Sequence, residues 1–204
     1  MDIKEFSTLI KEKAKELDDM AKHRLPVKIG RMAKDHYQDN FRKGGFVNKR
    51  LQRWPATKRQ QSGDTSAASN YGPLLSRRNH LFSSIKYMPS DYHVRVANDV
   101  PYASMHNYGG ETHPTVTPKM RRFAWAMCYN TSGIGKKPST GKKTGNRRKN
   151  NTASPQAEMW KRLALTKKKK LKVKIPKRQF IGESATLNAR IEKTIENEIR
   201  NILK

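Results

Sequence analysis

Few residues of this 204-residue chain could carry out chemistry, and the clearest pair is Tyr102 with His106. Their spacing of four would place both side chains on one face of a helical turn. Catalysis or metal binding would also need converging partners. No nearby set of Asp, Glu and His has ligand spacing, and His93 and His113 are the only further candidates. The sequence therefore predicts a structural, hydrogen-bonded His106 and no catalytic, cofactor-binding or metal-binding residue.

Gly109 and Gly110 follow this pair, and we expect them to supply a turn with positive φ. A phosphate-binding loop would need more amides and a following helix, which Pro114 disfavours. No nucleophile elbow, P-loop or paired-carboxylate pattern is present, and residues 44–130 contain only four acidic residues. The single cysteine, Cys128, excludes an internal disulfide framework and a multi-cysteine zinc site. The sequence thus predicts that the protein is not an enzyme.

Positive charge is the most unusual feature of the composition, because 44 Lys and Arg stand against 17 Asp and Glu, a formal net charge of +27. Residues 131–178 hold 17 basic residues and one acidic residue. Cations spread among flexible residues suit phosphate contacts, which need charge and reach but no fixed geometry. They suit an acidic protein surface equally well, so the partner class stays open. The candidate contact residues are Lys136, Lys137, Lys142, Lys143, Arg147, Arg148, Lys149, Lys167, Lys168, Lys169 and Lys170.

The three tryptophans, Trp54, Trp125 and Trp160, have two interpretations. They could stack on nucleic-acid bases, as aromatic residues do in proteins that bind single strands. Each has apolar neighbours in the sequence, however, which favours anchors in the core or between subunits.

Residues 176–180 form a corner between a predicted strand and the last predicted helix. Pro176 would stop the strand, because proline lacks the donor that a strand ladder needs. Phe180 would then fill the core behind the corner. Arg178 could alternatively form a salt bridge across a subunit interface, and the two interpretations are compatible.

Helical periodicity marks both ends of the chain. Apolar residues at steps of three and four predict a helix over 2–22 and a second over about 26–41, with Pro26 breaking or kinking the path between them. A stripe at steps of four, four, four and three predicts a terminal helix capped by Ser184 or Glu183. The stripe consists of Leu187, Ile191, Ile195, Ile199 and Ile202.

Short strands and turns fill the middle of the chain. Alternating residues and turn signals predict four strands that pair in one antiparallel sheet. The predicted strands are residues 82–87, 92–97, 112–117 and 171–175. Short helices are expected over 119–129 and 157–165, and residues 46–73 are predicted to be a long loop.

Together these elements predict an α+β fold, in which a small antiparallel β-sheet packs against the N-terminal helices and a C-terminal amphipathic helix. Residues 1–130 and 171–204 would form a single assembly domain. A basic flexible insertion at 131–170, with a short helix near 157–165, would interrupt it, because residues 131–156 are of low complexity. No apolar run is long enough for a membrane span, and the chain start lacks an apolar signal region.

Three sequence blocks together resemble the phage virion morphogenesis, or tail-completion, family. The blocks are residues 41–46 (FRKGGF) followed by Trp54, residues 81–110, and residues 175–182 (IPKRQFIG). The second block is similar to the family's pattern L-x-x-S-I … V … Y-A-x-x-H-x-x-G-G, and the third to I-P-x-R-x-F-[LI]-G. Order and spacing match over roughly 26–110 and 172–204, whereas residues 118–171 form an extended basic insertion relative to the shortest members.

This resemblance implies a structural virion protein that acts in tail completion or head–tail joining, as a cyclic oligomer at the neck or tail terminus around the DNA path. Its partners would be copies of itself, neighbouring neck, connector or tail-tube proteins and packaged DNA, with no membrane. It would be assembled in the bacterial host cytoplasm and reside in the virion. The assembly or family-motif residues would be Trp54, Tyr102, His106, Gly109, Gly110, Pro176, Arg178 and Phe180. The competing hypothesis is a free nucleic-acid-binding module whose basic loop contacts DNA or RNA phosphates.

Overall fold

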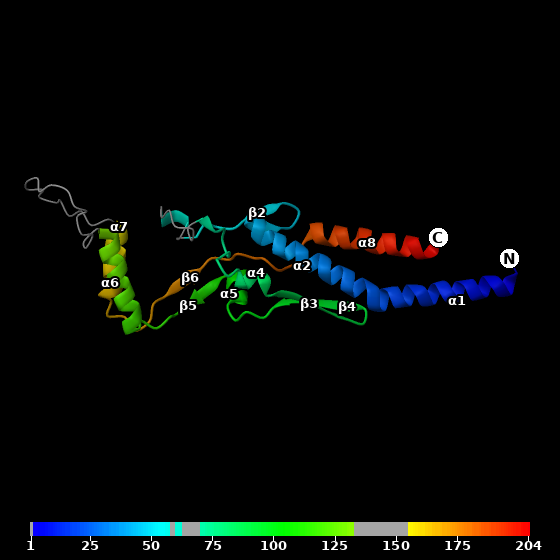
Figure 1. Cartoon of the computed structure of the whole chain (residues 1–204), viewed down its shortest axis with the longest axis horizontal. Helices are drawn as coiled ribbons and strands as arrows, with labels where there is room; N and C mark the ends of the chain where they lie inside the picture. Colours follow the sequence, from blue (N-terminus) through cyan, green and yellow to red (C-terminus); the bar gives the residue numbers. More distant parts are fainter. Residues whose placement is uncertain (1, 58–59, 63–69, 133–154) are drawn as a thin grey trace, which may run out of the picture. The chain divides into compact units, whose positions relative to one another are not determined.

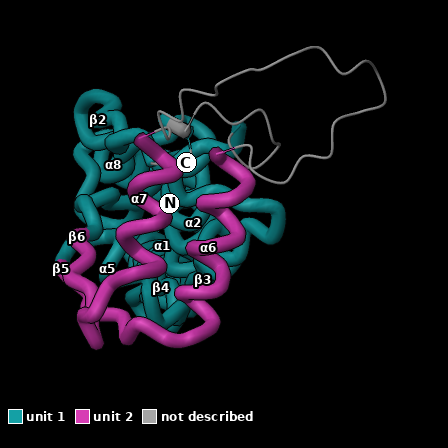
Figure 2. The backbone as a smooth tube through the Cα atoms, turned by 90° about the vertical axis from the view of Figure 1, so that its left-hand side faces the viewer, with its two compact units in different colours: residues 1–110, 175–204 teal, residues 111–174 magenta. Residues whose placement is uncertain are grey.

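The computed structural model describes residues 2–57, 60–62, 70–132 and 155–204, which form two compact units (Figure 2). Unit 1 comprises residues 1–110 and 175–204, and unit 2 comprises residues 111–174. These bounds differ from the division expected after residues 130 and 170. The separate roles of an assembly domain and an insertion stay a prediction.

One long helical run opens unit 1 (Figure 1). α1 (Ile3–Asp19) continues through a π-helical turn, η1 (Met20–Arg24), into α2 (Leu25–Lys43). The break predicted at Pro26 takes the form of this π turn, because proline has no N–H to offer the carbonyl four residues before it. That carbonyl, on Lys22, instead accepts a hydrogen bond from the backbone N–H of Tyr92 at 3.3 Å.

α2 ends at Gly44, which adopts a left-handed conformation with φ 64°, so the end predicted at the glycine pair is confirmed. The chain then forms an antiparallel ribbon of β1 (Gly45–Val47) and β2 (Leu51–Arg53). The sequence predicts a loop over 46–73 and therefore misses this ribbon. Strands of three residues are too short to show an alternating pattern. A 3-10 turn, η2 (Gln60–Ser62), follows.

An antiparallel hairpin packs against α2. The hairpin consists of β3 (Ile85–Ser90) and β4 (His93–Asn98), and the short helix α4 (His80–Ser83) precedes it. At Gly30 of α2, an added Cβ would lie 2.5 Å from the ring of Tyr87 and 2.7 Å from the side chain of Val94. The close approach of helix and hairpin therefore requires glycine at this position.

The described strands form three separate two-stranded sheets, so the single four-stranded sheet that the sequence predicts is wrong. β5 (Gly110–Thr112) pairs with β6 (Val173–Ile175) and not with the hairpin. Pro114 and Pro176 lie just beyond these strands and remove ladder donors, which keeps both strands short. The α+β class, with N-terminal helices, small sheets and a C-terminal helix, is confirmed.

The terminal helix α8 (Ala185–Leu203) is confirmed, and Ser184 caps it by accepting a hydrogen bond from the backbone N–H of Leu187 at 3.2 Å. The predicted apolar stripe contributes to both core clusters of unit 1. The larger cluster contains Phe41, Trp54, Phe180 and Leu187 among its buried residues. The smaller cluster consists of Met20, Leu25 and Ile202.

Unit 2 is built on two helices that pack together, α6 (Pro118–Ser132) and α7 (Pro155–Ala164). Both fall where the sequence predicts them, and an antiparallel bridge joins Thr115 to Lys170. Seven of the predicted contact residues, from Lys136 to Lys149, lie outside the described residues. Among the helices that are described, none is long and apolar enough to cross a membrane.

Candidate functional site

The family-motif residues of unit 1 meet where α5 (Ala103–Tyr108) approaches the segment that follows β6. α5 stops at Gly109, whose φ is 76°, and an added Cβ there would lie 2.9 Å from the backbone nitrogen of Lys177. Glycine is therefore needed both for this backbone conformation and for the close approach. The approach lets the backbone N–H of Arg178 donate to the carbonyl of His106 at 2.8 Å. Gly110 follows as the first residue of β5.

Two buried asparagines hold Phe180, and sequence analysis missed both. Asn107 Oδ1 accepts hydrogen bonds from the backbone N–H groups of Phe180 at 2.9 Å and Ile181 at 3.0 Å. Asn40 Nδ2 donates to the carbonyl of Phe180 at 3.1 Å, while its Oδ1 accepts from the backbone N–H of Val47 at 3.0 Å. Asn107 lies inside the second motif block, which was the signal available for it. No sequence pattern marks Asn40, because its partner Phe180 lies 140 residues away along the chain.

Trp54 is buried in the same core. Its Nε1 donates to the carbonyl of Gln179 at 2.8 Å, and its ring lies edge-on to Phe41 with centroids 5.5 Å apart. Since the side chain is only 8% exposed, it offers no open ring face to a nucleic-acid base. In unit 2, Trp125 stacks on Tyr129 at 5.8 Å, and both of these rings belong to α6.

Arg178 is a buried cation, with 7% of its surface exposed. Its Nε and Nη2 donate to the carbonyl of Pro55 at 3.1 and 3.0 Å. Burial lowers the pKa of the Arg178 guanidinium. No carboxylate pairs with it among the described residues, so backbone carbonyls supply its polar contacts. Pro176, two residues earlier, is exposed directly after β6.

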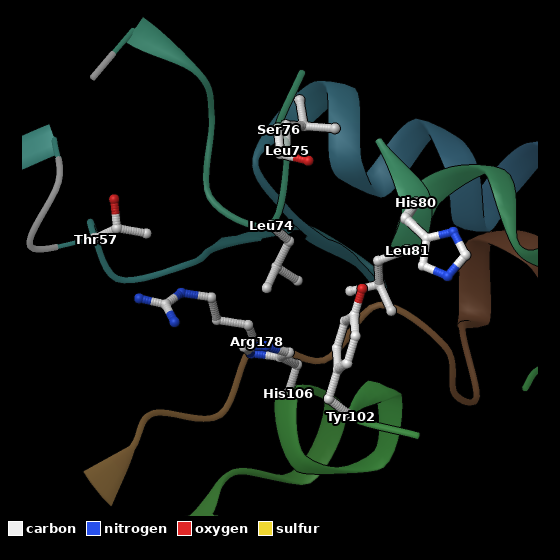
Figure 3. Close-up of a pocket in the computed structure, with 9 residues that line it drawn as sticks. All are labelled: Thr57, Leu74, Leu75, Ser76, His80, Leu81, Tyr102, His106 and Arg178. Atoms are coloured by element: carbon white, nitrogen blue, oxygen red, sulfur yellow. The ribbon is translucent and has the colours of Figure 1, made fainter. Parts of the chain in front are cut away.

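A pocket of about 290 Å³ opens beside these residues (Figure 3). Tyr102, the residue just before α5, and His106 of α5 have ring centroids 5.9 Å apart in an edge-to-face arrangement, as their spacing predicts. The side chain of Arg178 extends toward Thr57. The lining residues are Thr57, Leu74, Leu75, Ser76, His80, Leu81, Tyr102, His106 and Arg178. The described lining thus contains one cation, two imidazoles and no carboxylate.

The surroundings of His106 disfavour its charged form. Burial, and secondarily the positive charge of Arg178, hold the pKa of His106 below its usual value. Its Nδ1 is buried and has no hydrogen-bond partner within the described part of the chain. The hydrogen bond that the sequence predicts for this imidazole is therefore not found at Nδ1. The arrangement provides polar anchors for packing and lacks the nucleophile–base–orienter geometry of a hydrolytic site.

The described part of the basic segment is exposed. Lys167, Lys168, Lys169 and Lys170 are all open to solvent, and none of them pairs with a carboxylate of the described chain. Trp160 of α7 packs edge-on to Phe123 at 5.7 Å. No group of three or more His, Cys, Asp and Glu among the described residues is placed to hold a metal ion.

Comparison with known proteins gives one family match. The model of the phage virion morphogenesis family matches residues 2–200, which is nearly the whole chain. The match therefore extends over both units, including the residues between the motif blocks. No curated protein and no solved structure matches the chain.

Proposed function

The chain belongs to the phage virion morphogenesis family, and from this premise we propose that it acts in tail completion or head–tail joining. In this role it forms a cyclic oligomer at the neck or tail terminus, around the path of the DNA. Its mechanism is assembly through complementary surfaces, with no covalent step. Its partners are copies of itself and the neighbouring neck, connector or tail-tube proteins of the virion.

The observation that carries this proposal is the family match across residues 2–200. The structure is consistent with an assembly role, because the motif residues serve internal packing. Gly109, Trp54, Arg178 and Phe180 all make contacts within unit 1. They build a scaffold, and this leaves the outer surfaces of the helices for partners.

The basic segment would add charge to each subunit of the ring. Cyclic symmetry repeats one subunit's cations around the axis, which produces a positively charged annulus. Lys167 to Lys170 are exposed and lack acidic partners in the described chain, so they are available to packaged DNA or to an acidic neighbouring ring.

A phage that carries a nonsense mutation in this gene tests the proposal. In a non-suppressing host we expect filled heads and separate tails, or tails of abnormal length, in electron micrographs. Supplying the wild-type protein from a plasmid restores joined virions. Virions of normal length and normal infectivity without the protein would contradict the role.

A second candidate function is a free nucleic-acid-binding module, which the exposed lysine run at 167–170 favours. It predicts that the isolated monomer binds DNA or RNA tightly and loses affinity steeply as salt rises. The neck proposal predicts weak binding by the monomer and tighter binding by the assembled ring. Fluorescence anisotropy on size-fractionated protein at several salt concentrations separates the two.

A further inference from the structure

The pocket beside α5 contains a buried cation whose charge no residue of its lining balances. Arg178 is 7% exposed, and the other side chains of the described lining are apolar, hydroxyl-bearing or imidazole groups. Burial of a charge is costly unless an opposite charge pairs with it. No carboxylate among the described residues forms a salt bridge with this guanidinium. The charge of Arg178 is therefore open to a ligand that would balance it.

The guanidinium of Arg178 also keeps hydrogen-bonding capacity. Its Nε and Nη2 donate to the carbonyl of Pro55, and Nη2 lies 3.5 Å from the carbonyl of Ala56. Its Nη1 donates no hydrogen bond to any other described residue. The planar fork of N–H groups in a guanidinium matches an anion that offers two oxygens in one plane. The side chain extends toward Thr57, so its charged end belongs to the wall of the pocket (Figure 3).

The rest of the lining combines apolar surface with a few polar groups. Leu74, Leu75 and Leu81 supply the apolar part. His106 is a second polar group whose bonding is incomplete, because its buried Nδ1 has no hydrogen-bond partner in the described chain. Buried polar groups that lack partners are uncommon in folded proteins and often mark the position of a ligand or a water. This lining suits a ligand with one negatively charged end and a short aliphatic stem.

We propose that this pocket binds a carboxylate group, which pairs with the guanidinium of Arg178 while its aliphatic stem lies against the leucines. The carboxylate belongs either to a small organic acid or to an acidic side chain of a neighbouring protein chain, because both present the same chemistry. The inference goes beyond the proposed function, which assigns no ligand to any pocket. It does not depend on ring formation, since the binding is a property of the single chain.

A phosphate group fits this pocket less well than a carboxylate. Phosphate carries oxygens on every side, and some of them would face the leucines of the lining without a donor. The phosphates of DNA lie on the outside of the duplex, where the exposed lysines at 167–170 reach them more easily than a buried guanidinium does. A second pocket, at the end of α8, contains Glu196 beside Arg200 and Lys204, so there the chain itself supplies both signs of charge.

Acetate is the first probe of the pocket. In the full chain with isotope-labelled histidine, the imidazole NMR signal of His106 should shift with added acetate and reach saturation, because this ring shares the lining with Arg178. The His106→Gln variant identifies the signal by its loss. Sodium chloride at the same ionic strength should give no saturating shift, and the signal of His93, at an exposed position of β4, should not respond to acetate. A His106 signal that fails to saturate, or that responds to chloride equally, overturns the proposal.

Two variants test the part played by Arg178. Arg178→Gln should weaken acetate binding at least about tenfold, because it removes a charge-assisted hydrogen bond. If this variant fails to fold, Thr57→Asp decides, since it places a carboxylate of the chain itself at the wall toward which Arg178 extends. It should also weaken acetate binding at least about tenfold and raise the melting temperature by about 2 °C or more. Ser90→Asp, an equal change of charge at the exposed end of β3, is the matched control and should bind acetate as the wild type does. Wild-type acetate binding by Thr57→Asp contradicts the proposal.

Further probes separate the two sources of the carboxylate. The peptide acetyl-Gly-Glu-Gly-amide presents an acidic side chain on a polypeptide, and the same peptide with glutamine in place of glutamate is its control. If the glutamate peptide and acetate both shift the His106 signal to saturation, the source is an acidic side chain of a neighbouring chain. If acetate alone does so, the source is a small organic acid. Inorganic phosphate that binds more tightly than acetate overturns the proposal, and none of these results bears on head–tail joining, which the nonsense mutant decides.

Discussion

Individual polar residues of unit 1 act by satisfying buried backbone groups. Asn40, Asn107 and Ser184 each bond to backbone atoms that lie far from them along the chain. Arg178 does the same with the carbonyl of Pro55. A buried group that loses its partner keeps its desolvation cost, so such residues control stability more strongly than exposed ion pairs do.

Asn40→Ala should lower the free energy of unfolding by about 1–3 kcal/mol, because it leaves the N–H of Val47 and the carbonyl of Phe180 without their partner. Urea denaturation followed by circular dichroism measures the change. The control is Asn188→Ala, an exposed asparagine of α8, which should change stability little. Equal effects of the two substitutions would contradict the role assigned to Asn40.

His106 should make stability depend on pH. Above about pH 6.5, the usual histidine pKa, the imidazole is neutral in both the folded and the unfolded chain. Because burial lowers the folded pKa, acidification protonates the unfolded chain first, and the free energy of unfolding falls as pH falls. His106→Gln should therefore lose less stability between pH 7.5 and pH 5.5 than the wild type in urea denaturation.

The control for this pH dependence is His93→Gln, at an exposed position of β4. It should retain the pH dependence of the wild type. His36, whose pKa is also lowered, chiefly by burial, remains in every variant and contributes equally to each. A His106→Gln variant with the wild-type slope would show that His106 is protonated as easily in the folded chain as in the unfolded chain.

At the scale of elements, the helical run from α1 to α2 organises unit 1. The π turn releases the Lys22 carbonyl, which receives the N–H of Tyr92 at the tip of the β3–β4 hairpin. The hydroxyl of Tyr92 also donates to Asp18 at 2.8 Å, and Lys22 lies 3.4 Å from Asp91. The turn that proline imposes on the helix thereby becomes the point to which the hairpin is attached.

Gly30→Ala should destabilise the chain by about 1–3 kcal/mol, because the new methyl group overlaps Tyr87 and Val94 and forces the hairpin off α2. The gain in helix propensity offsets only part of this cost. Thermal unfolding measures it. At Gly72, an alanine would meet only the side chain of Leu75 at 3.4 Å, so Gly72→Ala should be nearly neutral. A neutral Gly30→Ala would show that the hairpin is displaced easily.

At the scale of the whole molecule, most of the net positive charge belongs to unit 2, whereas the hydrophobic core clusters of the described residues belong to unit 1. Unit 2 contains 18 Lys and Arg against two acidic residues, which is +16 of the total of +27. Unit 1 contains both core clusters and all eight family-motif residues. That unit 1 serves as an assembly scaffold and the basic segment as an insertion stays a prediction, and the bounds of the units differ from the expected ones.

Removing residues 111–174 should leave unit 1 folded. Gly109 approaches Lys177 closely, so a Gly-Ser linker of about four residues can join the two ends. The shortened chain should unfold cooperatively within about 5 °C of the wild type in thermal denaturation. Non-cooperative melting would show that unit 1 depends on unit 2 for its fold.

The sequence by itself determined the local features of this protein. The stripe of α8, its cap at Ser184, the end of α2 at Gly44 and the location of α6 and α7 follow from periodicity and from residue-specific backbone preferences. These depend on neighbours within a few residues. The concentration of charge and the family blocks were also readable without a structure.

Only the tertiary structure decided how the strands pair and which polar residues hold the core. The four strands predicted as one sheet separate into different ribbons, because the β3–β4 hairpin packs on α2 and β5 pairs with β6. Asn40 meets Phe180 across 140 residues of sequence. Such contacts depend on which buried groups remain unpaired once the whole chain has packed, and no local pattern in the sequence contains that information.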